Sequence, residues 1–182
     1  ADEGKIPPNV RIVRTSIGFP LIVPKRDWTK QLAKLSSNTK YHELIASHAN
    51  TDIAHGRCLL IVSERLEMLN ALKLLIPQSI LLVGATKNRD EILSKVGTSI
   101  RAILSTRIFD EGISCHRLDT IYLTCPGNNE AKLEQRIGRI QREHVDAKHP
   151  LVVDFWLAGS IVQAQQRNRS EWYVRNNFQI QN

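Results

Sequence analysis

The sequence predicts an α/β fold with a parallel sheet that is covered by helices on both faces. Two observations carry this prediction. From residue 57 onward, short apolar runs alternate with segments whose apolar residues recur at helical spacing. The apolar runs show no polar alternation, which is typical of strands buried on both faces, and strands separated by helices need crossover connections. Ligands of such folds bind in the crevice at the carboxyl ends of the strands.

The expected elements alternate along the chain. Strands are predicted at 57–62, 79–83, 101–105, 120–124 and 151–155. Helices are predicted at 64–76, which ends before Pro77, at 88–96, at about 129–143 and after residue 158. In the last of these helices, Trp172 and Tyr173 suit core packing better than stacking on bases.

The first part of the chain differs in character from the rest. Residues 1–40 are predicted to be a linker segment from a preceding domain, in which the alternating run at 10–14 could form an edge strand. Helices are predicted at 28–35 and 40–54, packed on the sheet. Residues 41–182 are predicted to form the main domain.

Composition and charge narrow the class of partner. The chain has 182 residues, of which 42% are hydrophobic and 24% charged, as in a globular domain with a proper core. Lys and Arg outnumber Asp and Glu by 25 to 18, and the net charge of +7 favours a polyanionic partner, nucleic acid first. No apolar run approaches the length of a membrane span, so no membrane partner is expected.

Cysteine and histidine give no sign of a metal site or a disulfide framework. The three cysteines have no C-x-x-C spacing, and the six histidines are scattered. We therefore expect no metal and a reducing, intracellular compartment: the cytoplasm of a bacterial host for a phage-encoded protein, otherwise nucleus or cytoplasm. The chain begins at Ala1 without a signal-peptide pattern, and we expect processing or truncation there.

The segment 135–142 is the most informative stretch of the chain. At about 100° per residue, one face of a helix gathers apolar side chains and the opposite face gathers an amide and two guanidinium groups. The apolar face holds Leu133, Ile137 and Ile140, and the polar face holds Gln135, Arg139 and Arg142. Arginine is well shaped to grip phosphate oxygens. A solvated basic face is the alternative interpretation.

Gly138 adds a second signal within this segment. A glycine inside a helix costs about 1 kcal/mol relative to alanine. Its presence predicts the close approach of a ligand or of another backbone at this point.

Four segments, in order, resemble the motifs of the second RecA-like domain of the superfamily-two helicases. Gln135-x-x-Gly138-Arg139-x-x-Arg142 resembles their motif VI. Motif V is resembled by the upstream segment Ile103-Leu104-Ser105-Thr106-x-x-x-x-Glu111-Gly112-Ile113-Ser114. Motif IV is similar to Leu59-Leu60-Ile61-Val62-Ser63. The nucleic-acid-contacting element between these two motifs is resembled by Leu82-Val83-Gly84-Ala85-Thr86 with Arg89. The match runs from about residue 40 to 176 and implies a RecA-like fold.

The resemblance implies a nucleotide side to the site. Arg139 and Arg142 would act as arginine fingers on the γ-phosphate of ATP, which is held with Mg²⁺ mainly by the absent N-terminal RecA-like domain. Gln135 would align the helix at the cleft between the two domains. Gly112, Ser114 and Gly138 would lie on the same side. Ser114 stands where many members have Asp, which weakens the ribose contact attributed to that Asp.

The resemblance also implies a nucleic-acid track built from loops at the strand ends. Its expected members are Ser63, Arg65, Gly84, Thr86, Lys87 and Thr106. Such groups hold the phosphate backbone without reading bases, so binding should tolerate sequence and weaken with salt. Solvated loop side chains are the alternative for each of them.

The chain lacks the motifs that would hold a nucleotide by itself. It contains no G-x-x-x-x-G-K-[ST] loop and no Asp-Glu element that follows a strand in the way a Mg²⁺ site requires. We expect the C-terminal motor domain of an ATP-dependent helicase or translocase, inactive alone, with DNA favoured over RNA. The alternative is a non-motor nucleic-acid-binding or annealing module of the same fold, in which Arg139 and Arg142 would have no use.

Overall fold

The computed structural model describes residues 6–84, 86–106, 115, 117–127, 130–140 and 148–181. The elements in chain order are β1 (Asn9–Gly18), α1 (Pro24–Ser36), α2 (Thr39–Ala54), β2 (Leu59–Val62), α3 (Leu66–Leu75), β3 (Ser79–Leu81), α4 (Arg89–Ser94), β4 (Ala102–Ser105), β5 (Thr120–Leu123), α5 (Glu130–Ile137), β6 (Leu151–Ala158), α6 (Ser160–Arg175) and β7 (Gln179–Gln181). The strands form one parallel sheet in the order β3-β4-β2-β5-β6-β1-β7. The predicted parallel α/β fold is confirmed.

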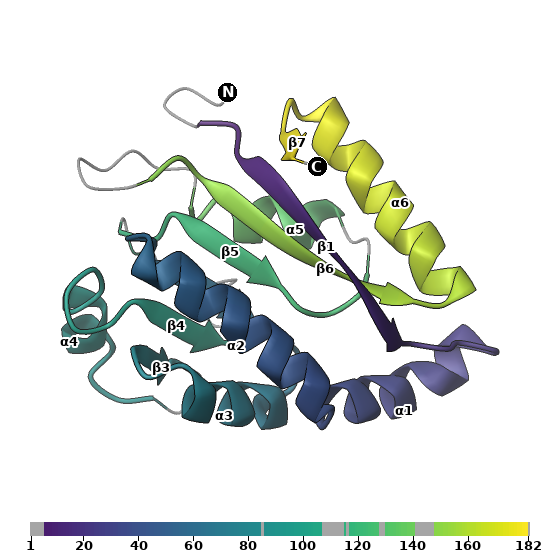
Figure 1. The fold of residues 1–182 in the computed structure, drawn as a ribbon, viewed down its shortest axis with the longest axis horizontal. Helices are drawn as coiled ribbons and strands as arrows, with labels where there is room; N and C mark the ends of the chain where they lie inside the picture. Colours follow the sequence, from purple (N-terminus) through teal and green to yellow (C-terminus); the bar gives the residue numbers. More distant parts are fainter. Residues whose placement is uncertain are drawn as a thin grey trace.

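The central strands are buried on both faces, as their unbroken apolar runs predict. In β2, Leu59 and Ile61 join the core that also contains side chains of α1, α2 and α3. Leu60 and Val62 join the second core, with side chains of α5 and α6 and contacts from α4. Figure 1 shows α2 in front of the sheet and α5 behind it. Each fully buried aliphatic side chain contributes about 1.5–3 kcal/mol, which makes the strand ends a firm base for loops.

The amino-terminal segment is part of this architecture. Phe19, Leu32 and Leu35 lie in the same core as residues of α2 and α3, so α1 packs on the sheet as predicted. β1 pairs with β6 on one side and β7 on the other, so it is not the edge strand that the alternating run suggested. The division of the chain at residue 40 remains a prediction. None of the helices among the described residues is long and apolar enough to cross a membrane.

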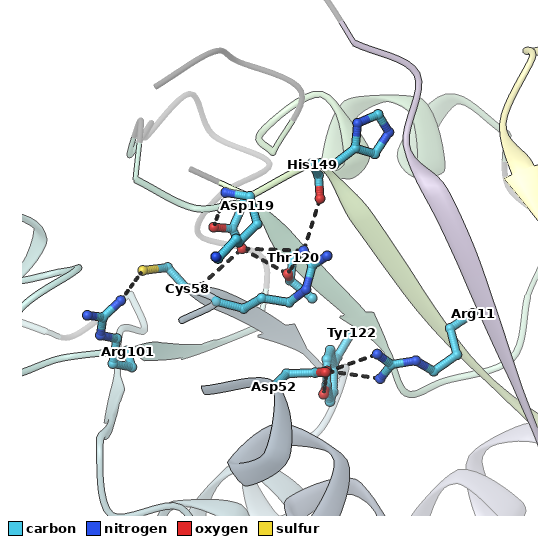
Figure 2. Close-up of polar contacts among 10 residues, drawn as sticks. Arg11, Asp52, Cys58, Arg101, Asp119, Thr120, Tyr122 and His149 are labelled. Atoms are coloured by element: carbon cyan, nitrogen blue, oxygen red, sulfur yellow. Dashed lines mark hydrogen bonds and ion pairs between the residues drawn. The ribbon is translucent and has the colours of Figure 1, made fainter. Parts of the chain in front are cut away.

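Partly buried polar contacts tie elements of the fold together away from the predicted site (Figure 2). Arg11 of β1 makes two hydrogen bonds of 3.0 Å to the carboxylate of Asp52 on α2, which also accepts one from the hydroxyl of Tyr122. Burial, followed by the Asp52 charge, raises the pKa of Tyr122, so the phenol stays a donor. This cluster locks α2 to two strands.

A second cluster lies at the amino ends of the strands. Asp119 is buried and accepts hydrogen bonds from the backbone N–H groups of Cys58 (3.1 Å) and Lys148 (3.2 Å). Arg57 donates to the hydroxyl of Thr120 at 3.0 Å and lies 3.8 Å from the Asp119 carboxylate. The segments that lead into β2, β5 and β6 are therefore held together at the edge opposite the carboxyl ends.

Candidate functional site at the carboxyl edge of the sheet

Three of the predicted loops leave the sheet at one edge. Val62 and Ser105 are register partners at the ends of β2 and β4, so Ser63 and Thr106 follow neighbouring strands. β3 pairs with the other side of β4 and leads into the loop of Gly84 and Thr86. The structure therefore brings together the strand ends on which the resemblance placed a nucleic-acid track.

Ser63 is a loop-forming residue in this structure. Its side chain is buried, and its hydroxyl accepts the N–H of Arg65 at 3.1 Å and donates to the Arg65 carbonyl at 3.3 Å. Arg65 is half-buried, and its guanidinium donates to the carbonyl of Thr29 on α1 at 3.4 Å. The loop after β2 is thus shaped by its own side chains and tied to α1.

The loop after β3 is held by an arginine and presents a lysine. Arg89 donates to the carbonyl of Gly84 at 2.6 Å and to that of Thr86 at 3.3 Å. The Thr86 hydroxyl accepts the N–H of Val83 at 2.9 Å. Gly84 and Lys87 are exposed. Lys87 is therefore an exposed cation at the carboxyl edge, and Arg89 holds the carbonyl groups of Gly84 and Thr86.

Part of the predicted nucleotide side falls outside the described residues. Gly112, Ser114 and Arg142 all lie there. Thr106 is half-buried at the last described position before that stretch. Next to it, the Ser105 hydroxyl is buried and has no hydrogen-bond partner among the residues that the structure describes.

The predicted helix at 129–143 is present, but its regular part is shorter than expected. Its apolar face is buried as predicted, at Leu133, Ile137 and Ile140. The α-helix ends at Ile137, and the next turn tightens, because the N–H of Arg139 bonds to the carbonyl of Arg136 at 3.2 Å. Gly138 therefore stands at the end of the helix and not in its interior.

The predicted close approach at Gly138 has no counterpart from another described segment. A Cβ at this position would meet the carbonyl oxygens of Glu134 at 3.2 Å and Gln135 at 3.4 Å, both in α5 itself. Apart from Gly138 itself and its two chain neighbours, no other described residue has an atom within 4 Å of that Cβ position. Crowding from another described element is therefore not the reason for this glycine.

Gln135 and Arg139 differ in environment. Gln135 is exposed and Arg139 is half-buried. The Nε of Arg139 is buried without a hydrogen-bond partner in the described part of the chain. A buried donor left unsatisfied costs about 1–3 kcal/mol, so this group suits an acceptor from outside the domain.

The loop between β5 and α5 is fastened from both sides of the sheet. Tyr41 of α2 donates to the carbonyl of Thr124 at 2.6 Å, and the Thr124 hydroxyl donates to the carbonyl of Val62 at 2.6 Å. Arg169 of α6 donates to the carbonyl of Gly127 at 2.7 Å. The described residues after β5, from Thr124 to Gly127, are therefore held by hydrogen bonds from α2 and α6.

Arg169 itself is held by a buried carboxylate. Its Nε donates to Asp154 of β6 at 2.8 Å, and a second guanidinium nitrogen pairs with the other carboxylate oxygen. Tyr173 donates to the same carboxylate at 2.7 Å. Burial lowers the pKa of Arg169, but the Asp154 charge outweighs it and keeps the pKa above its usual value.

Sequence reasoning missed this pair. The available signal was Asp154, an acid inside the apolar run of β6, because a buried carboxylate requires a partner. Nothing in the sequence singled out Arg169 from the other arginines of α6.

A pocket of about 280 Å³ opens at the carboxyl ends of β2 and β5. Side chains from two helices and from the strand ends line it: Trp28 of α1, Lys132 and Arg136 of α5, and Glu64 and Thr124. The strand order reverses between β2 and β5, because β3 and β4 lie on one side and β5 and β6 on the other. Such a switch point is the usual ligand crevice of an open parallel sheet. Within the described ranges, no group of three or more His, Cys, Asp or Glu side chains is arranged to hold a metal ion.

Comparisons with known proteins agree with this architecture. Residues 38–144 match the family described as "Helicase conserved C-terminal domain". The chain is 30% identical over 160 residues to "Probable helicase D10" of Escherichia phage T5, an alignment that covers 83% of this chain and 35% of that protein.

Solved structures show the same fold. The crystal structure of T4 UvsW gives a TM-score of 0.74 at 15% identity, covering 95% of this chain and 40% of that one. The C-terminal part of the Fun30 ATPase domain gives a TM-score of 0.55 at 16% identity, covering 64% of this chain and 40% of that one. The RecA-like fold is confirmed, and the chain spans well under half the length of these relatives.

Proposed function

The chain belongs to the helicase conserved C-terminal domain family, as the second RecA-like domain of a superfamily-two helicase, and from this premise we propose that it is one half of an ATP-driven motor on nucleic acid. The proposed partner is an N-terminal RecA-like domain of the same protein, which would hold ATP with Mg²⁺. This chain would supply arginine fingers and part of the nucleic-acid track.

One observation carries the proposal. The loops of Ser63, Thr86 and Thr106 follow three neighbouring strands and lie at the same edge as the start of α5. An edge that combines loops suited to bind phosphate with a helix bearing arginines could contact a strand and a nucleotide at once. That combination suits a motor better than a passive binding module.

Arg139 is the described residue that fits the nucleotide. Its partly buried side chain and its unsatisfied Nε suit an anionic acceptor brought by another domain. When bound, Mg·ATP supplies the phosphoryl group that is transferred to water. The guanidinium of Arg139, with that of Arg142, would neutralise the charge that develops on that group, an effect worth about 10³–10⁵ in rate in related enzymes.

The nucleic-acid contacts fall into two groups. Lys87, exposed, and the loop of Gly84 and Thr86 offer a cation and polar groups at the edge, and Thr106 is half-buried beside them. Ser63 would act by shaping its loop, since its hydroxyl already bonds within that loop. We propose that the bound strand is DNA, because the motif VI sequence Gln-Arg-Ile-Gly-Arg resembles that of the DNA-remodelling, viral and repair branches of the superfamily.

The test is replacement of the fingers in the full-length protein. Arg139→Ala and Arg142→Ala should each reduce nucleic-acid-stimulated ATP hydrolysis by about 10³-fold or more, with strand affinity nearly unchanged. Arg167→Ala, an exposed arginine on α6, is the matched control and should keep wild-type turnover. Normal turnover in both finger variants would refute the assignment. Unwinding of matched DNA and RNA duplexes by the wild-type protein tests the preference for DNA.

A further inference from the structure

The pocket between the ends of β2 and β5 has a wall that no helicase motif supplies. Trp28 belongs to α1, outside the segment 38–144 that matches the family. Its ring makes a T-shaped contact with Phe19, with centroids 5.2 Å apart and planes at 67°, and it stays half-buried. The indole is therefore held in place while part of it remains open to the pocket.

Two cations also line the pocket. Lys132 and Arg136 are one turn apart on α5, so they lie on the same flank of the helix. Glu64 adds an acceptor at the end of β2. An aromatic wall, two cations and a few polar groups match the parts of a nucleotide: a ring to stack, a phosphate to neutralise and edge groups to hydrogen-bond.

The size of the pocket limits the occupant. Pockets for drug-sized ligands span roughly 300–1,000 Å³, and this one, at about 280 Å³, lies just below that range. One nucleobase with its sugar-phosphate is an occupant on this scale, whereas a base pair is not. The pocket opens at the same edge as the loops of Ser63 and Thr106, where the proposed strand would run.

We infer that this pocket holds one unpaired nucleotide of the bound strand, with its base stacked on Trp28 and its phosphate near Lys132 and Arg136. The inference rests on the proposed function for the source of the nucleotide. Stacking tolerates any base, because every base has a π-face, so this site would grip the strand without reading its sequence.

The experiment uses the full-length protein and a labelled single-stranded oligonucleotide. Trp28→Ala should weaken binding about tenfold or more, and Trp28→Phe should lose less because it keeps an aromatic ring against Phe19. Trp156→Ala is the matched control, since Trp156 is a half-buried tryptophan outside the pocket, under the guanidinium of Arg14 at 4.9 Å. It should bind as the wild type does.

A series of oligonucleotides with one abasic site, moved along the strand, shows whether a base occupies the pocket. At one position of the abasic site, the affinity of the wild type should fall by the same factor as it does in Trp28→Ala. The affinity of Trp28→Ala for that oligonucleotide should not fall further. Tight wild-type binding with no sensitive position and no effect of either Trp28 variant would overturn the inference and leave the proposed function intact.

Failure of the wild-type protein to bind the single-stranded oligonucleotide would instead refute the proposed function. In that case AMP is added to the protein as a probe of the pocket. Quenching of tryptophan fluorescence that is lost in Trp28→Phe would show that the occupant is a free nucleotide and not a nucleotide of a bound strand. Absence of that quenching would overturn the inference as well. If Trp28→Ala does not fold, Trp28→Phe and the abasic series still decide the outcome.

Discussion

Arg169 on α6 donates a hydrogen bond of 2.7 Å to the carbonyl of Gly127, just before the loop enters α5. The helix after β6 thus contacts the chain at Gly127, before α5 and its residues Gln135 and Arg139. Arg169 lies beyond the segment that matches the helicase family, so we expect the setting of the proposed fingers to depend on residues outside that segment.

The first prediction concerns the clamp that Arg169 forms through its hydrogen bonds to Asp154 and Gly127. Arg169→Lys keeps a positive charge but replaces a planar fork by a single ammonium group, which cannot bridge Asp154 and Gly127 in the same way. We expect a loss of about 1–3 kcal/mol in the free energy of unfolding, measured in urea, together with a lower kcat for ATP hydrolysis by the full-length protein. Arg175→Lys, at an exposed pair with Glu130, is the control and should change neither quantity. An unchanged kcat in Arg169→Lys would show that the clamp does not set the fingers.

The second prediction separates two roles of Gly138. Alanine favours a helix over glycine by about 1 kcal/mol, but its Cβ would lie 3.2 Å from the carbonyl oxygen of Glu134, so the gain is offset. Stability in Gly138→Ala should stay within about 1 kcal/mol of the wild type. Hydrolysis by the full-length protein should fall by about 10²-fold if a nucleotide or the other domain approaches this point. Wild-type hydrolysis would show that nothing approaches there.

The third prediction uses two glycines at the ends of β1 and β6. Gly159 has φ +147°, and a Cβ there would lie 2.8 Å from the carbonyl oxygen of Phe19. At Gly18 the nearest atom to a Cβ is the Pro20 ring at 3.8 Å. Gly159→Ala should therefore lower the free energy of unfolding by about 1–3 kcal/mol, and Gly18→Ala by much less. Equal losses in the two variants would contradict the close approach at Gly159.

The fourth prediction is a pH dependence of stability. Burial, followed by the charge of Arg11, lowers the pKa of His48 below its usual 6.5. As the pH falls through about 6.5, the unfolded chain takes up a proton that the folded chain takes up only at lower pH, so this histidine lowers the free energy of unfolding on acidification. In His48→Gln, unfolding in urea at about pH 7.5 and about pH 5.5 should show a smaller difference than in the wild type. An unchanged difference in His48→Gln would show that this histidine does not contribute to the pH dependence.

Much of the fold follows from local sequence. β2, β4 and β5 are apolar runs with every residue buried, so their pattern matches their environment. β7 was missed because Gln179–Gln181 has little strand character of its own and becomes a strand only by pairing with β1. The possible edge strand became an interior strand for the same reason.

The site was less predictable than the fold. Ser63 and Thr106 could be placed together because parallel strands end at one edge. The use of the Ser63 hydroxyl within its loop and the pairing of Asp154 with Arg169 depend on side-chain geometry across distant segments. A regular helical projection also does not predict the tightened turn at Arg139.

The strand order has a consequence for any shortened version of the domain. β5 is covered on its outer side by β6, which is covered by β1, and both lie outside residues 38–144. A fragment cut at those limits would expose Thr120–Leu123 as an uncapped, apolar edge with free backbone donors and acceptors. Such an edge is a template for strand addition between copies, and in this domain β6 and β1 cover it.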